Sequence, residues 1–308
     1  MNIVLVGVCD VPSSTNTFMA KALTALGHSV VKYNYRSVLA ECSGDVERLG
    51  EKFIHTLKAI QKRRAVDLVI FCKTDTLPVS AHQRASSLTK TFYWFMDPIT
   101  TAKAMGAKDR ALACDYASAT CSEVVDYFKR SGQQNSYKIN EGVDLEMFRP
   151  SNVEKTTDVL FVGSPTNERA QAIDFLLNCG IQVKVFGQGW GGRFGAGHPV
   201  YNADLVAEIR RAKIVLNVSR TNSYSDRVTL SMAAGSFVLT SDVPEISNDF
   251  NVGIQLETFD SLDDLFHKVN YYLNKDVTRE AMAIVGCNHV HSTLSWETVC
   301  SSIVWKVV

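Results

Sequence analysis

The feature that most constrains the fold of this chain is a regular alternation of short apolar runs with amphipathic segments. Residues 2–7 (NIVLVG) and 66–72 (VDLVIFC) form runs that are too short for helices, and such runs are typical of strands buried in a parallel sheet. Residues 17–27 and 44–65 carry apolar side chains at helical spacing. Because strand and helix patterns alternate, the sequence predicts an α/β fold in which helices cover parallel sheets.

The alternation is interrupted by the polar segment 151–157 (SNVEKTT) and restarts at residue 158 with DVLFVGS. We therefore expect two Rossmann-like domains with doubly wound parallel sheets, residues 1–149 and 150–290, and then a C-terminal helix over 291–308 that could cross back to the first domain. Ligands of such sheets bind beyond the carboxyl ends of the strands. With two such domains facing each other, the expected site is the cleft between them.

Composition narrows the possible functions. Lys plus Arg equals Asp plus Glu, at 32 each, so the net charge gives no overall attraction to nucleic acid or to an acidic membrane. A local basic run, Lys62–Arg64, could contact DNA, although such runs are more often solvated helix ends. Eight scattered Cys without a CxxC pair predict reduced thiols and disfavour a zinc site. We expect no signal peptide or membrane span, and hence a cytoplasmic protein, either monomer or homodimer.

Two loops in the second half have the features of a phosphate site. In residues 158–172 a strand leads through Gly163 and Ser164 into a helix whose start carries Arg169. A helix start offers free N–H groups and a positive dipole, and an arginine there would add charge-assisted hydrogen bonds. In residues 216–246 a polar loop with Arg220 precedes a helix that starts near Arg227. A solvated arginine beside a capped helix is the alternative for each loop, but two arginines at one helix start favour phosphate binding.

Residues 184–192 (KVFGQGWGG) place glycines directly after a predicted strand. Glycine lets the backbone approach a flat ligand closely. Trp190 could stack on a base or pack on the sheet.

These stretches, in this order, resemble the group 1 glycosyl transferases of the GT-B fold, in the subgroup typified by spore-maturation-type glycosyltransferases. The resemblance covers about residues 137–300 and includes INEGVDLEMFRP at 139–150. It implies a nucleotide-diphosphate sugar donor, with a UDP-sugar as the expected co-substrate and no permanently bound cofactor. The donor would be held by the second domain.

The resemblance also assigns roles to particular residues. Gly163, Ser164, Arg169 and Arg227 would face the diphosphate. The remaining donor-binding residues would be Gly187 and Trp190 near the base, Arg220, Tyr224, Ser225 and Asp226 in the loop and helix start, and Glu245 after the following strand. The family usually has a ribose-binding Glu five residues before Gly235, where this chain has Leu230. Leucine accepts no hydrogen bond, which leaves open a different ribose contact, an unusual donor or a non-catalytic binding protein.

The reaction requires stabilisation of the leaving diphosphate, which arginines such as Arg227 and a helix start can supply without a metal. We find no convincing DxD pair and predict no catalytic metal. A retaining enzyme needs no dedicated base, whereas an inverting one would, and Asp97 at the end of the strand in 90–97 is the candidate. The alternative is that Asp97 caps the next helix. The acceptor could be a glycan, a lipid, a protein or a hydroxylated DNA base, and a sugar-nucleotide epimerase shares this fold.

Overall fold

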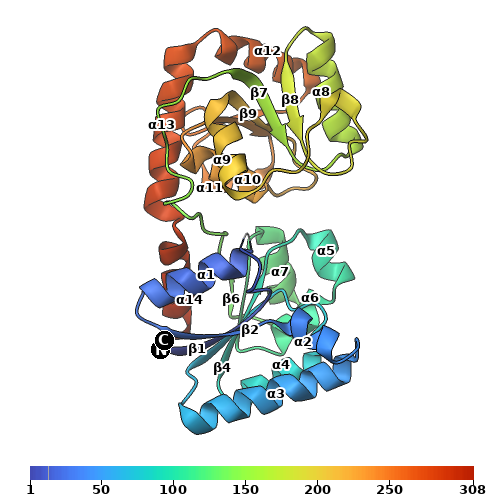
Figure 1. Ribbon diagram of the computed structural model, residues 1–308, viewed down its shortest axis with the longest axis vertical. Coiled ribbons are helices and arrows are strands. Elements are labelled where there is room, and N and C mark those ends of the chain that lie inside the picture. The colour runs from blue at the N-terminus through green and yellow to red at the C-terminus, as the bar shows by residue number, and fades with distance from the viewer. Residues whose placement is uncertain (13) are drawn as a thin grey trace. The chain divides into compact units, whose positions relative to one another are not determined.

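The computed structural model describes residues 1–12 and 14–308. The chain divides into two compact units (Figure 1). The first unit comprises residues 1–142 and 296–308, and the second comprises residues 143–295. Each unit is described separately below.

The first unit is built on a six-stranded parallel sheet in the order β2-β1-β3-β4-β5-β6. Its strands are β1 (Asn2–Val6), β2 (Ser29–Tyr33), β3 (Leu68–Cys72), β4 (Lys90–Phe95), β5 (Tyr116–Ala119) and β6 (Ser136–Lys138). Its helices are α1 (Thr15–Ala25), α2 (Tyr35–Glu41), α3 (Val46–Arg63), α4 (Val79–Ser86), α5 (Ile99–Ala104), α6 (Ala107–Leu112), α7 (Ser122–Arg130) and α14 (Trp296–Val307).

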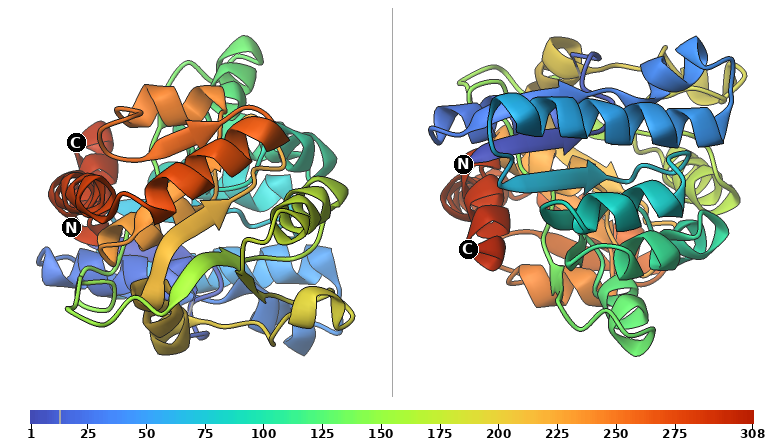
Figure 2. Two further views of the ribbon diagram at one scale, coloured as in Figure 1. Left: turned by 90° about the horizontal axis from the view of Figure 1, so that it is seen from above. Right: turned by 90° about the horizontal axis from the view of Figure 1, so that it is seen from below.

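Both faces of this sheet are covered, which explains why every residue of β3 is buried. On one face, α3 packs Leu49 and Phe53 against Val69 and Phe71 of β3; this helix is the long blue one in the right-hand view of Figure 2. On the other face, side chains of α1 and α14 pack against the alternate residues of β1, β3 and β4.

The second unit has a five-stranded parallel sheet in the order β11-β10-β9-β7-β8. Its strands are β7 (Thr157–Val162), β8 (Val183–Phe186), β9 (Ala212–Asn217), β10 (Phe237–Ser241) and β11 (Glu257–Phe259). Its helices are α8 (Asn167–Asn178), the 3₁₀ turn η1 (Arg193–Gly195), α9 (Asn202–Arg211), α10 (Asp226–Ala233), α11 (Pro244–Asp249), α12 (Leu262–Leu273) and α13 (Asp276–Thr293).

The prediction of two parallel-sheet α/β domains is confirmed. Residues 143–149 lie in the second unit, because Val143 N–H donates to the Leu294 carbonyl at 2.8 Å and Phe148 is buried in that unit's core. The helical tail divides at Ser295: α13 belongs to the second unit and α14 to the first. Within the described ranges, no helix is long and apolar enough to cross a membrane.

Candidate functional site

In the second unit the direction of strand succession reverses between β7 and β9, which lie side by side although β8 separates them in sequence. Ligands of open parallel sheets bind at such a switch point, beyond the carboxyl ends of the strands. The two loops that flank it are residues 163–166, which lead into α8, and residues 218–225, which lead into α10. These are the loops that the sequence identifies as phosphate-binding candidates.

Arg169 joins the two loops. Thr166 caps α8 by accepting a hydrogen bond from the Arg169 N–H, and the guanidinium is almost fully buried. Its Nε donates to the Val218 carbonyl at 3.1 Å and its Nη1 to the Ser164 carbonyl at 2.8 Å. Because both loops are tied to one rigid group, their backbones are fixed relative to each other.

The three predicted arginines lie close enough to influence one another electrostatically. Burial, and then the positive charges of Arg227 and Arg220, lower the pKa of Arg169 to about 10. Arg220 is exposed and Arg227 is half-buried, and neither forms an ion pair with another described residue. The structure therefore gathers three guanidinium groups at the switch point, and Arg220 and Arg227 form no ion pair within the described part of the chain. Such a cluster favours an anionic ligand.

The start of α10 adds backbone donors to these charges. Ser225 is the N-cap residue of α10, but its side chain does not cap the helix. Its hydroxyl donates instead to Asn217 Oδ1 at 3.1 Å, while Asn217 Nδ2 donates to Thr240 Oγ1 at 2.8 Å. The first N–H groups of α10 therefore have no side-chain acceptor from the cap residue, which suits an anion at this helix start. Asp226, in the first turn, is exposed.

Tyr224 and Glu245 have partners inside the protein. The Tyr224 hydroxyl donates to Asp249 Oδ2 at 2.6 Å, and its ring packs edge-on against Phe250. Burial, and then the Asp249 charge, raise the pKa of Tyr224 well above its usual range. Glu245 is buried in α11 and adds to the same effect. The Tyr224 hydrogen bond thus anchors the residue 218–225 loop to Asp249 of α11.

Gly187 and Trp190 support the loop after β7. The Gly163 N–H donates to the Phe186 carbonyl at 2.8 Å, and a Cβ atom at Gly187 would collide with the Gly163 carbonyl oxygen. Trp190 is 6% exposed, and its indole N–H donates to that same carbonyl at 2.9 Å. Two roles were considered for Trp190, stacking on a base and packing on the sheet. The structure shows the second, because the Trp190 ring packs edge-on against Phe161 in the core.

Leu230, which stands where a ribose-binding Glu is usual, lies half-buried on α10 and packs against the neighbouring core. Its side chain offers no hydrogen-bond acceptor.

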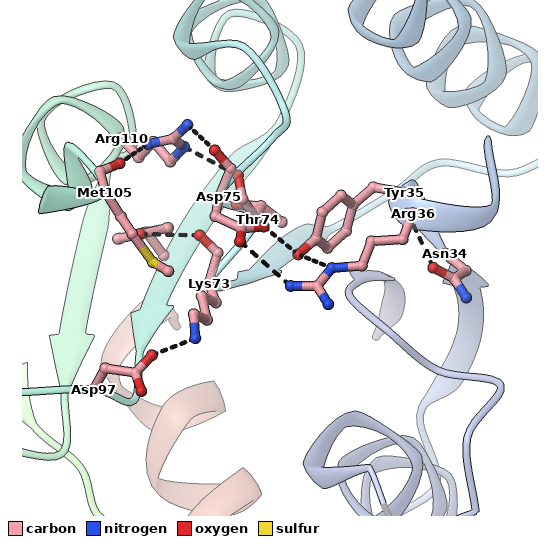
Figure 3. Close-up of polar contacts among 10 residues, drawn as sticks. Asn34, Tyr35, Arg36, Lys73, Thr74, Asp75, Asp97, Met105 and Arg110 are labelled. Atoms are coloured by element: carbon pink, nitrogen blue, oxygen red, sulfur yellow. Dashed lines mark hydrogen bonds and ion pairs between the residues drawn. The ribbon is translucent and has the colours of Figure 1, made fainter. Parts of the chain in front are cut away.

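Asp97 lies at the carboxyl edge of the first unit's sheet, two residues after the end of β4. Its Oδ2 is 2.5 Å from Nζ of Lys73, which directly follows β3 (Figure 3). The N-cap residue of α5 is Pro98, so the suggestion that Asp97 caps this helix is wrong. Sequence reasoning missed Lys73. The available signal was its position directly after the fully apolar strand β3, which pairs with β4, the strand that Asp97 follows.

The sequence and the structure were compared with known protein families and solved structures. Residues 169–304 match the family model described as glycosyl transferase-like. HepE of Anabaena, solved with UDP and glucose, is similar over 100% of this chain and 99% of its own, with TM-score 0.74 and 13% identity. A glycosyltransferase of Rickettsia africae (TM-score 0.72, 12% identity, 99% and 97% covered) and sucrose-phosphate synthase of Thermosynechococcus elongatus (0.67, 13%, 99% and 98%) are also similar. No curated protein sequence matches.

The fold is thus that of the GT-B glycosyltransferases, and the matched segment contains α10 and the arginines of the switch point. The predicted GT-B fold is confirmed, and the match of residues 169–304 to the glycosyl transferase-like family model agrees with the predicted glycosyltransferase function.

Proposed function

We propose that this glycosyltransferase takes its sugar from a UDP-sugar, and that the second unit holds the donor at the switch point between β7 and β9. The observation that carries the proposal is the cluster of Arg169, Arg220 and Arg227 beside the start of α10. Similarity to a protein solved with UDP and glucose supports the choice of nucleotide.

In the proposed reaction an acceptor hydroxyl oxygen forms a bond to the anomeric carbon, and the bond from that carbon to the diphosphate oxygen breaks. The bonding electrons leave with the diphosphate, whose negative charge therefore grows. Arg227, Arg220 and the N–H groups of α10 would stabilise that charge, and fixed donors of this kind are effective because they need no reorganisation.

Arg169 has a different role in this proposal. Its Nε and Nη1 already donate to backbone carbonyls. Arg169 therefore holds the two loops in place and adds a buried positive charge beside the site. We expect Arg227 to provide most of the stabilisation of the negative charge on the leaving diphosphate. Metal independence stays a prediction, and so does the role of Asp97 as the base of an inverting reaction.

A thermal-shift screen against the nucleoside diphosphates and their sugars tests the donor. A ligand that binds only the folded state stabilises it by RT ln(1 + [L]/Kd), about 2.7 kcal/mol at a concentration one hundred times Kd. We expect UDP and one or more UDP-sugars to raise the melting temperature more than ADP or GDP. Equal shifts with purine diphosphates would contradict the uridine assignment, and no shift with any of them would contradict a donor site in this chain.

A further inference from the structure

A short turn after β3, residues 73–75, has a backbone that side-chain-bearing residues rarely adopt. Lys73 has φ 62° and Thr74 has φ 42°. Both values lie in the left-handed region, which is especially unfavourable for a β-branched residue such as threonine. Strained backbone persists only where the surrounding structure enforces it, and it concentrates at functional sites.

Arg110, on α6, enforces this turn. Arg110 is 9% exposed, and its guanidinium donates to four backbone carbonyls of described residues. Three of these are the carbonyls of Thr74 at 3.0 Å, Met105 at 2.6 Å and Asp75 (Figure 3), and the fourth is that of Gly106 at 3.2 Å. A buried cation that makes no ion pair with a described residue is costly unless its donors are satisfied. Arg110 therefore connects α6 to the turn through its backbone.

Two further side chains hold the same turn from other elements. His82, on α4, lies with Nε2 at 2.9 Å from Thr74 Oγ1 and Nδ1 at 3.0 Å from the Pro78 carbonyl. The carbonyl can only accept, so Nδ1 carries the hydrogen and Nε2 accepts from the threonine. The Tyr93 hydroxyl, from β4, donates to the Lys73 carbonyl at 3.1 Å.

The result is that the Lys73 ammonium is directed to the Asp97 carboxylate at 2.5 Å, with 27% and 32% of the two side chains exposed. The pair lies at the carboxyl edge of the first unit's sheet, where ligands of such sheets bind. A simple surface ion pair contributes little stability and would not by itself justify a strained turn.

We propose that the Lys73–Asp97 pair binds hydroxyl groups of the acceptor, and that Arg110 is its positioning residue. The proposal rests on the proposed function, because it concerns the second substrate of that reaction. A carboxylate accepts and an ammonium donates, so the pair matches two neighbouring hydroxyls of an uncharged sugar, one donating to Asp97 and the other accepting from Lys73.

The charge at this edge favours an uncharged acceptor over nucleic acid. Within the first unit, whose segment after β6 ends at Gly142, the described loops and first helical turns that follow the six strands carry five acidic and two basic residues. These are Asp10, Asp75, Asp97, Glu123 and Glu141 against Arg36 and Lys73. A site for a phosphate backbone would carry an excess of Lys and Arg.

The basic run Lys62–Arg64 does not alter this balance. It lies where α3 ends, next to the start of β1, because Asn2 donates to the Ala65 carbonyl at 2.8 Å and to Asp67 at 2.6 Å. That is the opposite edge of the sheet from the Lys73–Asp97 pair.

Saturation-transfer NMR on the full chain, with UDP present and a panel of uncharged methyl hexosides as probes, tests the proposal. We expect hexoside signals with wild type that fall by about tenfold or more in Asp97→Asn and Lys73→Met, a loss corresponding to one charged hydrogen bond. Lys52→Met is the matched control, because it breaks the exposed Lys52–Glu41 pair (3.1 Å) of the same unit and should change nothing.

Three outcomes would overturn the proposal: no hexoside signal with wild type, an equal signal in Asp97→Asn, or binding of a single-stranded oligonucleotide that these substitutions weaken. The UDP signal is read in the same samples. Its absence from wild type would contradict the donor proposal instead, so the two failures are distinguishable.

Lys73→Gly and Arg110→Met separate a functional role from a structural one. Glycine adopts φ 62° readily, so Lys73→Gly should keep or raise the melting temperature while the hexoside signal is lost. Arg110→Met should weaken the signal in the wild-type background but add nothing in Asp97→Asn, since the two act on one contact. A hexoside signal that survives Arg110→Met would contradict its positioning role.

Discussion

At the scale of single residues, both units use a buried arginine in the same way. Arg169 donates to two loop carbonyls in the second unit, and Arg110 donates to the carbonyls of the residue 73–75 turn in the first. In each case the guanidinium fixes backbone next to a solvent-accessible charged group. The sequence predicted that Arg169 contacts the ligand. A single sequence does not report that the donors of this side chain are already hydrogen-bonded to a backbone carbonyl far along the chain, that of Val218.

His82 belongs to the same network and gives a pH-dependent prediction. Burial, and then the Arg110 charge, lower its pKa to about 3, so it stays neutral in the folded chain when an unfolded histidine would protonate near pH 6.5. Between these values the unfolded state binds the extra proton, and stability falls as the pH falls. We expect His82 to contribute a loss of up to about 4 kcal/mol by pH 3.

The measurement is the free energy of unfolding of wild type and His82→Gln from pH 7 to pH 3. The difference between the two should shrink or reverse as the pH falls, because glutamine does not titrate. His55→Gln, at an exposed position of α3, serves as the control. A difference that is constant with pH would show that His82 is not held neutral.

At the scale of elements, sequence periodicity predicted most strands and the longer helices. The apolar runs at β1, β3, β7 and β9 are unmistakable, since both faces of each sheet are covered. It missed the short helices α2, α4, α5 and α6, which have six to eight residues. Two turns are too few to establish a helical period, and these helices depend on tertiary packing.

The candidate site was predictable to the same extent. The loops after β7 and β9 follow from local pattern, because a parallel sheet brings its carboxyl ends to one edge. The burial of Trp190 and the Tyr224–Asp249 hydrogen bond (2.6 Å) depend on contacts between distant segments. The Lys73–Asp97 pair depends on a strained turn that no local pattern reports.

The close approach of β7 and β8 at their carboxyl ends gives a prediction for this element pair. Gly187→Ala should lower the free energy of unfolding by about 2 kcal/mol or more, because its Cβ would meet the Gly163 carbonyl and displace the loop after β7. UDP affinity should fall with it. Denaturant unfolding and a UDP titration measure the two effects.

Gly191→Ala is the matched control for that experiment. Gly191 also has positive φ (60°), but a Cβ there meets no atom within 4 Å. Gly191→Ala should lower the free energy of unfolding only by the cost of the left-handed backbone, about 1 kcal/mol, and its UDP affinity should equal that of wild type. If Gly187→Ala bound UDP as tightly as wild type, the prediction that the loop after β7 takes part in donor binding would be contradicted.

At the scale of the whole molecule, the two units repeat one topology. In each sheet the second strand lies outside the first, and succession reverses between the first and third strands: β1 and β3 in one unit, β7 and β9 in the other. The candidate donor and acceptor groups lie at the carboxyl edges of the second and the first unit, respectively. Equivalent edges of two similar folds thus carry different chemistry, arginines in one case and a Lys–Asp pair in the other.

The central claim is that the arginine cluster of the second unit binds the diphosphate of a nucleotide sugar. Its most direct test is calorimetric titration of UDP into wild type, Arg227→Ala and Arg193→Ala, the last removing an exposed arginine that pairs with Asp174 outside the cluster. We predict that Arg227→Ala weakens UDP binding at least about tenfold, equivalent to ~1.4 kcal/mol, and abolishes sugar transfer with the melting temperature unchanged, while Arg193→Ala binds as wild type does. Wild-type affinity in folded Arg227→Ala would contradict the claim.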